Sequence, residues 1–316
     1  MTLTQELAVG TTIDQRFSKL GSRGVRFHPA LTQCVSAWCG TSGEGKSSLL
    51  QSCPDAFILN TDLSSTSNPD PHAFIWPCIN EAGQPTEADG SVIPDLTWGD
   101  CLERVEIVRD MNRNKVEGAP KLVVLDTIDT AVRLAMAHEV KSLGKTSWDE
   151  LYGPAAWAAV HDQFVNLAHD NKRVGVGTAF ILHLTTKTIS EGEGHKAKKI
   201  ILEDVPRLTD NFWGKLNDIC EIVGIVEQGT TTRAVKKIRT NASTGEPILN
   251  PKTGQPLETT ETIQIPRVIV SFEPRYKEVA KRRSGIATSI EIPPRDGWAV
   301  LEEAYRKGLE AEESTT

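Results

Sequence analysis

The stretch GTSGEGKSS, residues 40–48, decides the fold around which the rest of the chain must be built. It matches the pattern G-x-x-x-x-G-K-[ST], with Gly40 and Gly45 at the glycine positions, followed by Lys46 and Ser47. Glycines let the backbone wrap until several N–H groups point inward at phosphate oxygens. An apolar run precedes the stretch and SSLLQS follows it, so a strand and a helix are expected on either side of a phosphate-binding loop.

Two residues of this loop have specific expected roles once a nucleoside triphosphate binds. We expect Lys46 to reach the β- and γ-phosphates and the Ser47 hydroxyl to ligate Mg²⁺. The residues expected to contact the nucleotide are Gly40, Thr41, Ser42, Gly43, Glu44, Gly45, Lys46, Ser47 and Ser48. The weaker interpretation is a glycine-rich turn with an incidental lysine.

A second motif is the apolar run KLVVLDTID, residues 121–129, which is typical of a parallel strand buried on both faces. Asp126 is predicted to hold Mg²⁺ through its water shell, although an aspartate there could also simply cap the next helix. Because threonine and not glutamate follows Asp126, a catalytic base is expected elsewhere. The best candidate is Asp62, at the end of a strand predicted over 56–62. If that strand neighbours the strand of the phosphate loop, Asp62 faces the γ-phosphate and can activate water; the alternative is a turn cap.

Strands and helices are expected to alternate, which predicts an α/β fold with a mostly parallel sheet. The expected strands are 33–39, 56–62, 121–129 and 177–184, the expected helices are 98–111 and 154–171, and 80–95 is expected to form an exposed loop or hairpin. After residue 211 we expect antiparallel strands at 221–228, 232–240 and 265–273 joined by an insert over 241–258, then a helix at 298–309. The predicted divisions are an N-terminal arm (1–30), a core (31–210), a β-rich extension with the final helix (211–310) and a frayed acidic tail (311–316).

Charge and composition restrict the class of protein. With 35 basic against 42 acidic residues the formal charge is −7, so coating of nucleic acid by bulk positive charge is not expected. The apolar stretches fall well short of the roughly 18 residues that a membrane span needs. The six cysteines include no C-x-x-C pair, and we expect buried free thiols. We therefore expect a cytoplasmic protein without membrane contact.

The order of GTSGEGKSS, FILNTD, LVVLDTID and FILHL resembles the RecA-like ATPases. The chain is most similar to phage-encoded members with a minimal RecA core, often described as ATP-dependent single-strand annealing or recombination proteins. The resemblance covers roughly residues 30–310, although only the loop and the LVVLD strand are specific motifs. It implies a RecA-like P-loop core with helices on both sides of a central sheet and antiparallel strands at the C-terminus. It also implies binding and hydrolysis of ATP with Mg²⁺.

The resemblance assigns roles to two further residues. In this family an acidic residue, usually glutamate, closes the second strand, and the matching residue here is the shorter Asp62. A polar residue ending the strand after the metal aspartate senses the γ-phosphate and links it to a DNA-binding loop, and the matching residue is His183. The alternative for His183 is an ordinary hydrogen-bonded residue at a strand end.

The loop after the sensor strand lines the DNA channel in RecA-like proteins. Here residues 189–199 are polar and glycine-bearing and are expected not to pack; their lysines are Lys196, Lys198 and Lys199. Flexible cations can follow a single-stranded backbone and release its counterions, so the resemblance implies contact with single-stranded DNA. The alternative is a solvated charged loop. The resemblance further implies a homo-oligomer with ATP between subunits, in which Arg282 and Arg283 of a neighbour complete the site.

Three hypotheses for function follow. The first is a homo-oligomeric, DNA-stimulated ATPase in phage-type recombination or annealing. The second is a phosphate-loop kinase for a small molecule or nucleotide, against which no arginine-rich lid is obvious. The third is a protein that uses ATP as a switch, such as a helicase loader.

Overall fold

The structure is a computed structural model that describes residues 29–63, 72–191, 198–240, 245–251, 253–272, 287–293 and 296–314. Leu31–Thr316 form one compact unit. The expected N-terminal arm lies almost wholly outside the described residues, as do Lys196, Arg282 and Arg283.

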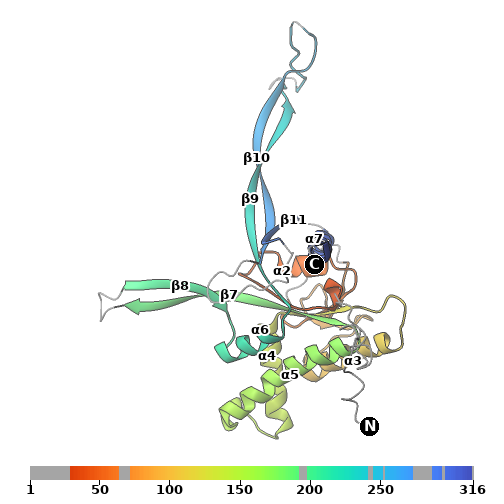
Figure 1. Ribbon diagram of the computed structural model, residues 1–316, viewed down its shortest axis with the longest axis vertical. Helices are drawn as coiled ribbons and strands as arrows, with labels where there is room; N and C mark the ends of the chain where they lie inside the picture. The colour runs from red at the N-terminus through yellow and green to blue at the C-terminus, as the bar shows by residue number, and fades with distance from the viewer. Residues whose placement is uncertain are drawn as a thin grey trace, which may run out of the picture. The chain divides into compact units, whose positions relative to one another are not determined.

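The core of this unit is a sheet with the strand order β11-β10-β9-β1-β7-β6-β2-β3 (Figure 1). The strands are β1 (Val35–Gly40), β2 (Ala56–Asn60), β3 (Phe74–Trp76), β6 (Leu122–Asp126), β7 (Gly177–Glu191), β9 (Ile222–Ile238), β10 (Glu258–Ser271) and β11 (Ser289–Ile292). Neighbours from β9 to β3 pair in parallel, whereas β10 pairs antiparallel with both β9 and β11. The predicted α/β fold, mostly parallel with antiparallel strands at the C-terminus, is confirmed.

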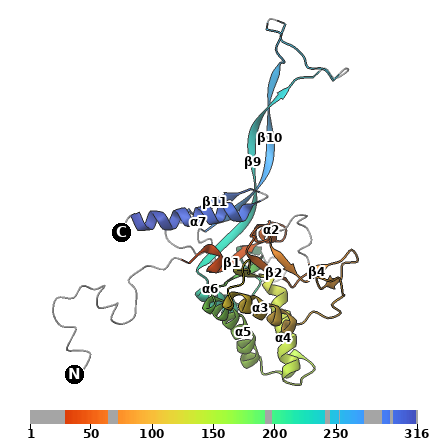
Figure 2. The same cartoon turned by 90° about the vertical axis from the view of Figure 1, so that its right-hand side faces the viewer.

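Helices cover both faces of the sheet (Figure 2). One face carries α3 (Trp98–Arg113), α4 (Ile128–Ser142), α5 (Gly153–Arg173) and α6 (Asp210–Ile219), and the other carries α2 (Lys46–Gln51) and α7 (Gly297–Ser314). In β1, Val35 and Cys39 pack towards the first group of helices and Trp38 packs towards the second. Because successive side chains of a strand point to opposite faces, a strand that is apolar throughout must be covered on both sides.

The strand β7 is longer than expected. It continues past its parallel partners and pairs antiparallel with β8 (Lys198–Pro206), from Leu184 opposite Pro206 to Glu191 opposite Lys198. Parts of the polar loop expected over 189–199 therefore belong to these two strands. The β-branched residues in LTTKTIS and KKIILEDV favour a hairpin, which satisfies their backbone groups despite the nearby glycines and charges.

The C-terminal strands also differ from expectation. Residues 221–228 and 232–240, expected as two strands, form the single strand β9, which pairs with β10 from Ile225 to Ile238. Only the segment Ile222–Ile225 of β9 pairs with β1 in addition. Within the described residues, most of β9 and β10 pair only with each other, and this ribbon extends from the sheet (Figure 1).

The helices predicted at 98–111, 154–171 and 298–309 are confirmed within a few residues. The expected strand over 121–129 ends at Asp126, because α4 begins at Ile128 with Thr127 as its N-cap. The acidic tail is not frayed throughout, since α7 continues to Ser314. Residues 80–95 include β5 (Pro85–Thr86), which forms a hairpin with β4 (Cys78–Ile79); short 3-10 turns lie at Leu31–Gln33 and Trp148–Glu150. In the described part of the chain no helix has the length and apolarity that a membrane crossing requires.

Candidate nucleotide-binding site

The phosphate loop connects β1 to α2, and steric reasons explain its glycines. Gly43 and Gly45 have φ angles of 85° and 91°, in the left-handed region that favours glycine. A Cβ on Gly40 would lie 2.4 Å from the backbone oxygen of Val226 in the neighbouring strand β9. The glycines that define the motif are thus needed by the loop and by the sheet beside it.

Lys46 lies folded back over the loop and is 4% exposed. Its Nζ donates to the backbone oxygens of Gly40 at 2.9 Å and Thr41 at 2.6 Å. Burial lowers the pKa of Lys46, and nearby carboxylates, with Glu44 the strongest, partly oppose this shift. The lysine is therefore already placed at the loop, held by carbonyl groups that a phosphate can replace.

Glu44 places a carboxylate against the same loop. Its Oε2 accepts a hydrogen bond of 2.7 Å from the backbone N–H of Thr41. That N–H is among the groups expected to face phosphate, so Glu44 must turn away before a nucleotide can use it.

Asp126 is the last residue of β6 and is fully buried. Its charge is close enough to raise the pKa of Lys46. Together with the hydroxyl of the half-buried Ser47, at the start of α2, it offers the oxygen ligands that Mg²⁺ prefers. One carboxylate and one hydroxyl suit a Mg²⁺ ion that also keeps several waters and contacts substrate phosphates.

His183 lies in β7 directly opposite Gly40, where the parallel pairing with β1 ends. It is not at a strand end as expected, because β7 continues into the hairpin with β8. Its Nδ1 lies 3.0 Å from Oδ2 of Asp129, in the first turn of α4. Asp129 was not predicted as a site residue; the signal for it in the sequence is a second acid in LVVLDTID, three residues after Asp126.

The strand that leads to Asp62 does not neighbour the strand of the phosphate loop, so the condition under which Asp62 was expected to face the γ-phosphate is not met. Between β2 and β1 stand β6 and β7. Asp62 follows the end of β2, and its backbone N–H lies 3.4 Å from the backbone oxygen of Asp126. The acid that the structure brings against His183 is Asp129.

Of the residues expected to bind nucleic acid, Lys198 and Lys199 begin β8, opposite Glu191 and Ser190 of β7. The structure thus puts their backbone in the hairpin that continues from His183.

Comparison with known proteins identifies one family. A model of an AAA domain matches residues 33–284, which is well over half of the chain. No curated protein matches the chain. The match spans the phosphate loop, Asp126 and His183 within a sheet of the P-loop type. The chain therefore belongs to the AAA domain family and is a nucleotide-binding protein of the P-loop ATPase class.

Proposed function

We propose that the protein hydrolyses ATP and acts on single-stranded DNA in phage-type recombination or annealing. The observation that carries this proposal is the course of β7. This strand pairs with β1 beside the phosphate loop and then continues without a break into the β7–β8 hairpin. A change at His183 when the γ-phosphate binds or leaves can thus act on a segment that contains Lys198 and Lys199.

Residues of the phosphate loop and of β6 supply the contacts to the nucleotide and its metal ion. Lys46 and the loop amides hold the phosphates, while Ser47 and Asp126 hold Mg²⁺. Bound Mg²⁺ supplies positive charge against the phosphate oxygens. In hydrolysis the oxygen of water bonds to the γ-phosphorus, the bond to the β,γ-bridging oxygen breaks, and ADP leaves with that electron pair.

The active form in this proposal is a homo-oligomer with ATP between subunits. A basic residue of the neighbouring subunit stabilises the charge of the transition state, and Arg282 and Arg283 are the candidates from the sequence. They lie outside the described residues, so the resemblance alone supports this part.

The test is steady-state ATP hydrolysis with and without single-stranded DNA. We expect DNA to stimulate turnover and Lys46→Ala to abolish turnover in both conditions, because the loop loses its phosphate-binding cation. Hydrolysis that depends on Lys46 but ignores DNA would refute the DNA part and favour a small-molecule acceptor. Tight ATP binding without turnover would favour the ATP switch.

A charge variant separates DNA binding from nucleotide binding. Replacing Lys196, Lys198 and Lys199 together by glutamine should weaken binding of single-stranded DNA while basal hydrolysis remains. The slope of log affinity against log salt should fall by about 2, at about 0.7 per contact. The matched control replaces three exposed lysines elsewhere, Lys141, Lys145 and Lys307, which changes the net charge equally. Equal losses in both variants would show that only net charge matters.

A further inference from the structure

Asp129 and His183 form a side-chain pair that bridges two elements of the site. Asp129 belongs to the first turn of α4, directly after β6, and His183 belongs to β7. The 3.0 Å contact joins Asp129 Oδ2 to His183 Nδ1, and the same oxygen lies 3.4 Å from the backbone N–H of His183. The side chains are only 17% and 20% exposed. A contact with both the backbone and the ring fixes the imidazole more tightly than one ring contact would.

The pair lies beside the phosphate loop. His183 is opposite Gly40 in the register of β7 and β1. Burial is the main cause of the lowered pKa of Lys46, and Asp129 is among the charges that oppose the shift. Asp129 is thus within electrostatic reach of the lysine that is expected to hold the γ-phosphate.

The contact determines which nitrogen of His183 remains for a ligand. An ionised carboxylate can only accept hydrogen bonds, so Nδ1 of His183 must carry the proton. In the neutral ring Nε2 then has a lone pair and can accept a proton, but it cannot donate a hydrogen bond to a phosphate oxygen. A neutral His183 held in this way suits a water molecule at Nε2, and a change at the γ-phosphate then reaches His183 through that water.

We infer that His183 is the base of ATP hydrolysis and that Asp129 is its positioning residue. This inference rests on the proposed hydrolysis. As the oxygen of water bonds to the γ-phosphorus, one proton of that water passes to Nε2 of His183. The resulting imidazolium is balanced by the Asp129 carboxylate, and ADP departs with the electron pair of the broken bond. The proton leaves His183 for solvent after phosphate is released.

The pair supplies a base in a chain where threonine follows Asp126, the place at which a catalytic glutamate would otherwise stand. The competing explanation for Asp129 is a favourable charge at a helix N-terminus, which stabilises a helix without acting in catalysis. Asp210 is likewise an acidic residue in the first turn of a helix, α6, but it is not part of the nucleotide-binding site. It therefore serves as the matched control.

The experiment compares Asp129→Asn with Asp210→Asn in the full chain. We expect Asp129→Asn to lower kcat by about 100-fold, within the range for loss of a positioned base. KM and the dissociation constant for ATP should change less than about twofold, because the phosphate contacts remain. Asp210→Asn should leave kcat unchanged. Nitrogen-15 NMR of the imidazole supplies a readout besides activity: the wild type should show His183 protonated at Nδ1, and Asp129→Asn should shift the proton towards Nε2.

The outcomes separate this inference from the proposed function. If Lys46→Ala abolishes hydrolysis but Asp129→Asn preserves kcat, the base assignment is wrong and the ATPase proposal stands. A wild-type ring protonated at Nε2 would overturn the assignment as well. If the wild type does not hydrolyse ATP even with DNA, both proposals fail.

Discussion

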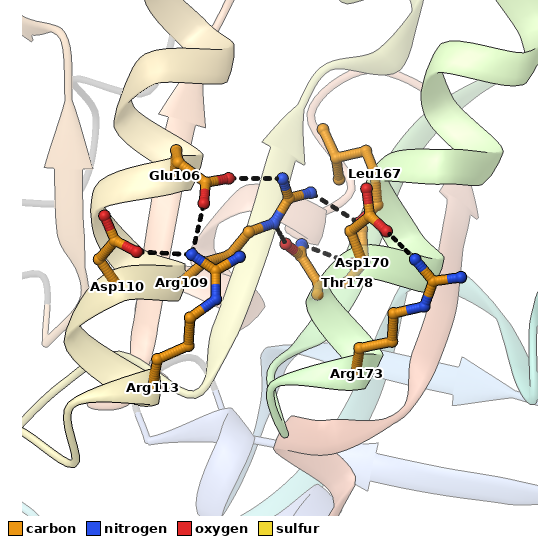
Figure 3. Close-up of polar contacts among 9 residues, drawn as sticks. Glu106, Arg109, Asp110, Arg113, Leu167, Asp170, Arg173 and Thr178 are labelled. Atoms are coloured by element: carbon orange, nitrogen blue, oxygen red, sulfur yellow. Dashed lines mark hydrogen bonds and ion pairs between the residues drawn. The ribbon is translucent and has the colours of Figure 1, made fainter.

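At the scale of single residues, Arg109 is a buried cation whose partners come from two helices (Figure 3). Its Nε donates to Oδ1 of Asn171 at 2.7 Å, its Nη2 to the backbone oxygen of Leu167 at 3.1 Å, and its Nη1 to Glu106 at 2.9 Å. Asn171 is fully buried and donates in turn to the Thr178 hydroxyl at 2.9 Å. The guanidinium therefore ties α3 to α5 and, through Asn171, to the start of β7.

This network predicts a large loss of stability when the guanidinium is removed. Arg109→Met should lower the free energy of unfolding by about 2–4 kcal/mol, because it leaves buried acceptors without their donor. The control is Arg113→Met, whose ion pairs with Glu106 and Asp110 are exposed. Urea unfolding followed by circular dichroism should show a lower midpoint for Arg109→Met alone. Equal midpoints for the two variants would mean that the network adds no stability.

Single residues of the site also differ in how far the sequence alone could predict them. The phosphate loop was predictable because its glycines, lysine and serine are adjacent in the chain, and their spacing is itself the signal. The pair of Asp129 and His183 joins residues 54 positions apart. Their contact depends on the strand order that puts β7 between β1 and β6, which no local pattern specifies.

At the scale of elements, the base of the β9–β10 ribbon contacts the phosphate loop. Gln228 of β9 donates from Nε2 to the backbone oxygen of Gly43 at 2.7 Å. Val268 of β10 lies 3.1 Å from the position that a Cβ on Gly45 would take. Both strands of the ribbon thus touch the loop at glycines whose conformation shapes the phosphate site.

This contact predicts a modest effect on nucleotide binding. Gln228→Ala removes one exposed hydrogen bond to the loop and should weaken binding of a fluorescent ATP analogue about 2–5-fold, in line with one neutral hydrogen bond. Thr230→Ala, one step further along the same face of β9, is the control and should bind as the wild type does. An unchanged affinity for Gln228→Ala would show that the ribbon does not support the loop.

Element type was more predictable than element length. Continuous apolar runs identified the strands β1 and β6, and the helices α3 and α5 were expected at nearly their observed bounds, because each of these elements can be recognised within one window of sequence. The extent of β7 and β9 was missed because each continues beyond the sheet on an antiparallel partner, where backbone pairing replaces burial as the stabilising interaction. No helix was expected over the residues of α4, whose apolar first turn directly follows the apolar strand β6 and was included in the expected strand over 121–129.

At the scale of the whole molecule, the burial of the cysteine side chains shows how completely the two layers of helices cover the sheet. The described residues include all six cysteines, none of which forms a disulfide; Cys34, Cys39, Cys53, Cys101 and Cys220 are buried and Cys78 is exposed. The expectation of buried thiols is thus confirmed except at Cys78, in the short β4–β5 hairpin. The buried thiols are divided between the two faces of the sheet.

This distribution predicts the reaction of the native protein with a thiol reagent. Burial raises the pKa of Cys39, Cys53 and Cys101 to about 12. At pH 8 only about 1 in 10,000 of each is then the reactive thiolate, in addition to being shielded from the reagent. Ellman's reagent should therefore label one thiol per chain rapidly, and all six only after denaturation in guanidinium. Cys78→Ser should remove the rapid phase, whereas a second rapid thiol in that variant would show that one layer of helices opens on the timescale of the reaction.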